Sequence, residues 1–175
     1  MQQPPLLPEI VLARVHTMAR RNGLSILIVA SAGAVLQAAG HDLVGAVAAL
    51  LAAGAGAMEI HGASLLRQGA KEAVAWMIRA ELFLLGVILL YCYLRLVNPH
   101  LDEMRAAFRA SLELPMMRSR WDELQQLGFT EDMYLHLVNR LTCIALTLAS
   151  LLYQGGMVFY YSRRRRPIET ALENE

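Results

Sequence analysis

The sequence predicts an all-α, polytopic membrane protein: a four-transmembrane-helix bundle with an amphipathic helical segment between its third and fourth membrane helices. Composition is the first observation behind this prediction, because 56% of the 175 residues are hydrophobic and only 18% are charged. Soluble domains average roughly 45–50% apolar and about 25% charged residues. A chain of this composition has too few polar side chains to cover a water-facing surface, and its length suits a single membrane domain, residues 1–175.

Four long apolar stretches are the second observation. A helix needs about 20 mostly apolar residues to cross a hydrocarbon layer roughly 30 Å thick. The stretches that meet this requirement are residues 23–40, 43–66, 73–97 and 141–162. The first could instead be the core of a cleaved signal peptide. The long segment before it carries Glu9, however, and the residues around Ala38 and Ala39 make a poor cleavage site, so we expect a membrane helix.

The distribution of basic residues is the third observation. Lys and Arg accumulate on the cytoplasmic side of membrane proteins. Here they lie before the first stretch, between the second and third, and after the fourth: Arg14, Arg20, Arg21, Arg67, Lys71 and Arg163 to Arg166. The connection 98–139 holds four arginines, but seven acidic residues outnumber them. We therefore expect a protein of the cell (inner) membrane with both termini cytoplasmic, a cytoplasmic or interfacial N-terminal segment (1–22) and a cytoplasmic tail (163–175).

The segments outside the four stretches also show helical patterns. Within 1–22, apolar residues such as Val11 and Val15 predict a short interfacial helix. Within 98–139, apolar residues recur at helical spacing until Pro115, and a second amphipathic piece surrounds Trp121. Thr130, followed by two acidic residues, is a good N-cap for a helix that runs unbroken into the fourth stretch. We expect 98–139 to form an outer helical cap whose net acidity argues against nucleic-acid binding.

Small residues recur every four positions in the second stretch. Gly45, Ala49 and Ala53 form one row, and a neighbouring row ends at Gly56. Such rows let another helix backbone approach closely. We expect this helix to lie at the centre of the bundle or at an interface between copies of the chain in a homo-oligomer. The alternative is a plain compositional bias toward alanine.

Five polar residues share one predicted depth, about 12 Å from the cytoplasmic boundary by helical rise. These residues are Glu59, His61, Arg79, Glu81 and Gln154. Ionisable groups at depth are costly unless they are paired or wetted. One interpretation is a structural ion pair between Glu59 and Arg79. Another is a path for protons, ions or a small charged solute, in which Glu59 or Glu81 titrates and His61 relays. A third has Arg79 extend to the interface.

The two cysteines lie at matching predicted depth near the outer ends of the third and fourth stretches. Cys92 precedes Arg95 by three residues, and Cys143 follows Arg140 by three. They could form a disulfide if their faces meet, or act as small buried hydrophobic side chains. No spacing typical of a metal site, a cofactor-binding loop or a catalytic nucleophile occurs. We expect neither a metal nor a cofactor, and no enzymatic activity.

Two functions remain open at this stage. The first is a non-enzymatic, homo-oligomeric membrane protein that conducts or transports a small ion or solute through the polar belt. The second is a membrane scaffold or accessory subunit that binds a protein partner through the outer cap. In either case the lipid bilayer is the first expected partner.

Overall fold

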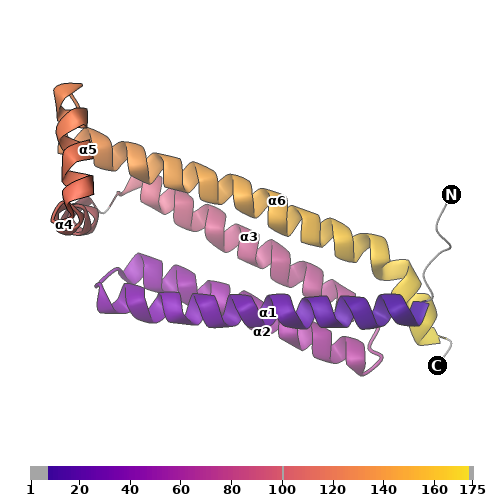
Figure 1. Cartoon of the computed structure of the whole chain (residues 1–175). Helices are drawn as coiled ribbons and strands as arrows, with labels where there is room; N and C mark the ends of the chain where they lie inside the picture. The colour runs from indigo at the N-terminus through magenta and orange to yellow at the C-terminus, as the bar shows by residue number, and fades with distance from the viewer. Residues whose placement is uncertain (1–7, 100, 174–175) are drawn as a thin grey trace, which may run out of the picture. The chain divides into compact units, whose positions relative to one another are not determined.

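The computed structural model describes residues 8–99 and 101–173, without the side chains of residues 8, 9, 103 and 171–173. Within these ranges the chain forms α-helices and no strand (Figure 1). The all-helical prediction is therefore confirmed. The helices are α1 (Pro8–Ala39), α2 (Leu43–Arg67), α3 (Ala73–Val97), α4 (Leu101–Ser111), α5 (Pro115–Gln126) and α6 (Glu131–Glu173).

Four of these helices are long and apolar enough to cross a membrane. The qualifying segments are Ile10–Ala39, Leu43–Arg67, Ala73–Val97 and Glu131–Thr170. At 1.5 Å per residue, the 43 residues of α6 extend about 65 Å, roughly twice the thickness of a hydrocarbon layer. Helix α6 runs unbroken from Glu131 to Glu173, which confirms the predicted continuity of the last helix. The Thr130 hydroxyl accepts a hydrogen bond from the Met133 backbone N–H at 3.3 Å, as an N-cap does.

The chain divides into two compact units. The first, which we call the bundle unit, comprises Met1–Leu89 and Ala149–Glu175. It contains α1, α2, the beginning of α3 and the end of α6. The second, which we call the cap unit, comprises Leu90–Leu148. It contains the end of α3, both short helices and the beginning of α6.

The core of the bundle unit includes residues of the segment before residue 23, in which the sequence predicts a short interfacial helix. Residues 8–39 form one continuous helix, and Val11, Val15 and Ala19 are buried along one side of it. Their spacing of four residues keeps them on a single helix face. They pack with Leu66 of α2 and with α3 and α6. Burial of this apolar face explains why α1 does not break at residue 22.

The predicted tail, 163–175, is also largely helical. Helix α6 continues through the arginine run and past Pro167 to Glu173. Ile168 is only 1% exposed and belongs to the same core as Val11 and Val15. On the exposed side, Arg165 donates to Glu169 at 2.8 Å. An apolar side chain two residues beyond the arginine run therefore keeps this segment folded on the bundle unit.

Helices α1 and α2 lie in close backbone contact at two glycines, Gly23 and Gly56. A Cβ atom built on Gly56 would lie 2.7 Å from the Gly23 carbonyl oxygen and 2.7 Å from the Leu27 nitrogen. Among the predicted packing residues, Gly45, Ala53 and Gly56 are buried and Ala49 is half-buried. The row of small residues thus lies against α1 within the same chain.

The cap unit is organised around three aromatic rings. Trp121 of α5 is buried, and its ring centroid lies 5.0 Å from that of Phe108 and 5.5 Å from that of Tyr134. These separations are typical of edge-to-face aromatic pairs, which stabilise by about 0.5–1.5 kcal/mol beyond their buried area. One ring comes from each of α4, α5 and α6, so the cluster joins these three helices of the unit.

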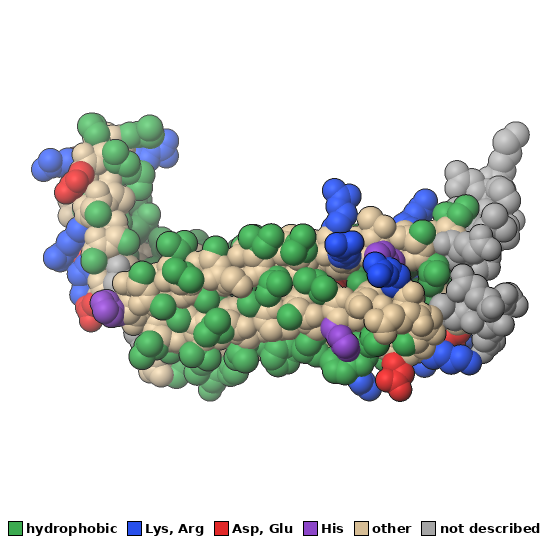
Figure 2. Space-filling model, turned by 90° about the horizontal axis from the view of Figure 1, so that it is seen from below, with side chains coloured by type: hydrophobic (Ala, Val, Ile, Leu, Met, Phe, Trp, Pro, Cys, Tyr) green, Lys and Arg blue, Asp and Glu red, His purple; other side chains and the backbone are tan. Residues whose placement is uncertain are grey.

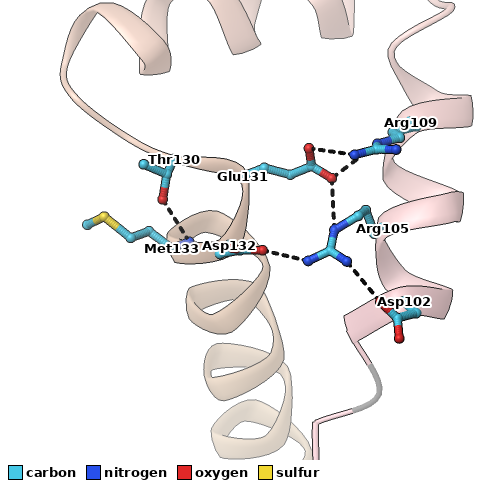
Figure 3. Close-up of polar contacts among 7 residues, drawn as sticks. All are labelled: Asp102, Arg105, Arg109, Thr130, Glu131, Asp132 and Met133. Carbon is cyan, nitrogen blue, oxygen red and sulfur yellow. Dashed lines mark hydrogen bonds and ion pairs between the residues drawn. The ribbon is translucent and has the colours of Figure 1, made fainter.

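Ion pairs join α4 to the first turn of α6 beside this cluster (Figure 3). Arg105 donates to Asp132 at 2.6 Å and to Asp102 at 2.8 Å, and Glu131 lies 3.3 Å from both Arg105 and Arg109. The hydrogen bond that Arg105 donates to Asp132 raises the pKa of the guanidinium, which therefore stays charged. Exposed ion pairs of this kind are screened by water and contribute little to stability, so the aromatic cluster is the stronger link between these helices.

The two cysteines meet within the cap unit as free, buried thiols. Cys92 of α3 is 3% exposed and Cys143 of α6 is 4% exposed. The thiols lie within hydrogen-bonding reach of each other. Nearby, the Asn139 side chain donates to the Arg95 carbonyl oxygen at 2.9 Å and sets the register between these two helices.

Replacement of Gly56 by alanine should destabilise the bundle unit by about 1–3 kcal/mol, because the new methyl group would collide with the α1 backbone. Gly54 is the matched control: it lies on the same helix, and a Cβ there meets nothing within 4 Å. Gly54→Ala should be neutral or stabilise by up to about 1 kcal/mol. Equilibrium unfolding in mixed detergent micelles measures both. Equal effects of the two substitutions would contradict the close approach.

Oxidation of the purified protein by copper phenanthroline should cross-link Cys92 to Cys143 within one chain. These are the only two cysteines of the chain, so intact mass after alkylation reports the product directly. The cross-linked protein should take up no alkyl group, and the Cys92→Ser variant should not form the internal bond. If the wild-type protein still takes up two alkyl groups after oxidation, the α3–α6 register described above is wrong.

Candidate functional site

Polar side chains from all four helices of the bundle unit converge on one point. Asn22 comes from α1, Glu59 from α2, and Glu81 from the part of α3 that belongs to this unit. Helix α6 supplies two hydroxyl groups, those of Tyr153 and Tyr161. We call these five residues the carboxyl site.

The Asn22 side-chain amide stands at the centre of the carboxyl site. Its Nδ2 donates to Glu59 Oε2 at 2.7 Å and to Glu81 Oε1 at 2.9 Å. Its Oδ1 accepts a hydrogen bond from the Tyr153 hydroxyl at 2.6 Å. An amide has two N–H donors and a carbonyl acceptor, so this arrangement uses both of its polar ends. One side chain of α1 thereby bridges α2, α3 and α6.

The two carboxyl groups are deeply buried and close together. Glu59 and Glu81 are each 1% exposed, and each lies within hydrogen-bonding reach of the other. The hydroxyl of Tyr161, a fully buried residue, donates to Glu59 Oε1 at 2.6 Å. Both oxygens of Glu59 thus have a donor. Glu81 Oε2 is buried and has no hydrogen-bond partner among the described residues.

Every hydrogen-bonding partner of the pair that the structure describes is electrically neutral. Two negative charges this close repel strongly, and burial removes the water that would screen them. A buried acidic pair without a basic neighbour is therefore stable only when a proton or a bound cation offsets its charge. The free oxygen of Glu81 and the Glu59–Glu81 contact are the places where such a charge can reside.

The structure does not bring Glu59 to Arg79, and this corrects the predicted ion pair. Arg79 is exposed, and its guanidinium carbon lies 5.9 Å from the centroid of the Trp76 ring. Residues 79 and 81 are two positions apart on α3, about 200° around the helix. Glu81 takes the inward position, so Arg79 faces outward. The predicted belt thus separates into a buried acidic pair and an exposed cation.

The other two predicted belt residues lie outside the carboxyl site. His61 is exposed, and its ring stands edge-to-face against Trp76 with centroids 5.3 Å apart. Gln154 of α6 is 6% exposed, and its Oε1 has no hydrogen-bond partner among the described residues. It follows Tyr153 directly in the chain, and its Oε1 is, besides Glu81 Oε2, a further buried acceptor without a described partner.

Sequence reasoning missed Asn22, Tyr153 and Tyr161. Asn22 directly precedes the first apolar stretch, and Tyr161 lies near the end of the fourth, so neither stands out as a polar residue at depth. One signal was available, because Gln154, Tyr161 and Ile168 recur every seven residues, as buried positions on one helix face do. The hydrogen-bonding partners themselves cannot be found from spacing within one helix.

A cleft of about 690 Å³ opens beside the carboxyl site between α1 and α6. Its lining includes Asn22 and Tyr153 from the site, together with Arg14, Thr17 and Arg21 of α1. The half-exposed Tyr153 ring therefore separates the buried carboxyl groups from the outside. Among the described residues, no group of three or more His, Cys, Asp or Glu side chains is placed to hold a metal ion.

The chain matches no known protein family, and neither a curated protein nor a solved structure is significantly similar to it.

Replacement of Tyr161 by phenylalanine should destabilise the bundle unit by about 1.5–3 kcal/mol, because it removes a buried donor from a carboxyl group. Tyr160 is the matched control, since its hydroxyl is buried without a partner among the described residues. Tyr160→Phe keeps the ring over which Arg164 lies and should be neutral or mildly stabilising. Unfolding of both variants in mixed micelles gives the comparison. A larger loss for Tyr160→Phe than for Tyr161→Phe would contradict the described hydrogen bonding.

Proposed function

We propose that the protein crosses the cell (inner) membrane four times, with both termini cytoplasmic, and transports or conducts a small ion or solute by loading a proton on Glu59 and Glu81. The four membrane-length helices and the basic residues at their predicted cytoplasmic ends support the membrane arrangement. The observation that carries the transport proposal is the buried carboxyl pair whose described hydrogen-bonding partners are all neutral.

Burial of two carboxyl groups beside each other lowers the stability of the fold. Their presence therefore favours a functional role over a purely structural one. A structural link between α2 and α3 could be made by apolar packing or by a carboxylate with a basic partner, at less risk to stability. Intramembrane carboxyl groups are rare in proteins and mark ion pathways and proton relays. In this chain two of them share one donor nitrogen, so the charge of one depends on the charge of the other.

Access to the pair supports the same proposal. Asn22 lines the cleft and also donates to both carboxyl groups, so a proton that passes between the cleft and the pair crosses a single layer of side chains. The hydroxyl of Tyr153 holds the amide in place and closes that layer. A rotation of Tyr153 would open it. A single bundle of four helices has little room for an aqueous path, and we propose a homo-oligomer to complete it.

Proteoliposomes that carry the full-length protein should show proton flux under an imposed membrane potential, followed with an internal pH-sensitive dye. Glu59→Gln and Glu81→Gln keep the side-chain shape and remove the titrating group, so each should abolish most of this flux. Glu72→Gln is the matched control, because Glu72 is an exposed carboxylate in the turn directly before α3. It should leave the flux unchanged.

Two outcomes would refute the transport proposal. One is the absence of any flux above that of empty liposomes. The other is wild-type flux in both Glu→Gln variants with unchanged stability, which would leave the pair without a role in transport.

A scaffold function is the second candidate, and one observation favours it. The cap unit exposes large apolar side chains: Leu127 is 76% exposed, Met116 73% and Leu114 60%. Apolar side chains exposed in this way are typical of surfaces that contact a protein or a lipid. Under this alternative, serine substitutions at the three positions would abolish partner binding, and the carboxyl site would be dispensable.

A further inference from the structure

Two arginines of the cleft beside the carboxyl site have no role in the proposed transport step. Arg14 and Arg21 are exposed on α1, and neither has a hydrogen bond or ion pair with another residue of the described ranges. They are seven residues apart, so they lie on one face, about 10.5 Å from each other along the helix axis. An anion seated midway would be within reach of both guanidinium groups.

The rest of the lining has the chemistry of a lipid headgroup site. The hydroxyl protons of Thr17 and Ser25 are used in bonds to the Ala13 and Asn22 carbonyl oxygens. Their oxygens are therefore left as acceptors for a hydroxyl group of a ligand. Guanidinium groups for a phosphate and acceptors for a neighbouring hydroxyl together match a phosphodiester headgroup that carries an alcohol.

The same helix face continues as an apolar surface. Ile28 lies seven residues beyond Arg21 and is 59% exposed, and Leu24 is 48% exposed. On the α6 side, Leu152 is 78% exposed next to the cleft residue Tyr153. Figure 2 shows a similar division along α1 and α2, with Lys and Arg side chains gathered toward the end at which α1 begins and mostly hydrophobic side chains beyond them. An acyl chain would pack against this adjoining apolar surface, whereas a free anion would make no favourable contact with it.

We infer that the cleft between α1 and α6 binds an anionic phospholipid of the cytoplasmic leaflet, with its phosphate between Arg14 and Arg21 and an acyl chain along Leu24 and Ile28. Basic pockets between membrane helices on the cytoplasmic side are a recognised mode of anionic lipid binding. The inference rests on the proposed membrane arrangement of α1 and α6. It does not depend on transport. Lipid binding can be retained when the flux experiment fails, and flux can be observed when lipid binding is absent.

The test compares binding of phosphatidylglycerol and phosphatidylcholine of identical acyl chains to the full-length protein in detergent, by native mass spectrometry and by thermal stabilisation. The wild-type protein should prefer phosphatidylglycerol. The Arg14→Gln/Arg21→Gln variant should lose about tenfold in affinity for each guanidinium removed. Arg20→Gln/Arg67→Gln is the matched control, because it removes the same charge from a different cleft, lined by His16, Arg20 and Arg67. It should keep the preference.

Three results would overturn the inference. Equal losses of phosphatidylglycerol affinity in the two double variants would show that binding depends only on general positive charge. If the wild-type protein shows no preference for phosphatidylglycerol over phosphatidylcholine, the cleft is not a site for anionic lipid. Equal stabilisation by inorganic phosphate, with displacement of the lipid, would make it a site for a free anion. Arg14→Lys/Arg21→Lys keeps the charges and should retain most of the binding, which separates loss of the site from loss of folding.

Discussion

The bundle unit depends on how it accommodates two acidic side chains that it buries together. Glu59 and Glu81 lie inside the four helices, and a single amide nitrogen, that of Asn22, donates to both. These two hydrogen bonds fix the rotation of α1, α2 and α3 about their axes. With Glu81 inward on α3, Arg79 must face outward, and with Glu59 inward on α2, His61 must do the same, since each pair is about 200° apart on its helix. The polar interior therefore also determines which charges remain on the surface.

Close packing of two helix backbones places the amide where it is needed. Gly23 directly follows Asn22, and it lies against Gly56, which precedes Glu59 by less than one turn of α2. A side chain at either glycine would force α1 and α2 apart and lengthen the Asn22–Glu59 hydrogen bond of 2.7 Å. The steric contact and the hydrogen bond therefore support each other. Small residues in α2 serve the carboxyl site as well as the packing of the helix.

Asn22 and Tyr153 separate two chemically opposite environments. On the inner side are the carboxyl groups, and on the outer side is the cleft with Arg14 and Arg21. Among the described residues, no ion pair joins the two carboxyl groups to the two arginines. The hydrogen-bonded layer of Asn22 and Tyr153 therefore keeps these opposite charges apart. A lipid phosphate would neutralise the arginines on the outer side of this layer, and a proton would neutralise the carboxyl pair on the inner side. Proposed transport and proposed lipid binding thus meet at the same two side chains.

Hydropathy, helical periodicity and capping chemistry are local properties, and they were enough to predict the all-helical fold, the four membrane-length helices and the Thr130 N-cap. They also marked Glu59 and Glu81 as polar residues in apolar surroundings. The partners of these residues come from other helices, and spacing along one helix carries no information about the rotation of its neighbours. Tertiary packing alone decided that Glu59 meets Glu81 and Asn22 instead of Arg79. It also decided that α1 runs unbroken from Pro8 to Ala39, because the buried face of Val11, Val15 and Ala19 finds its apolar partners only in the assembled bundle.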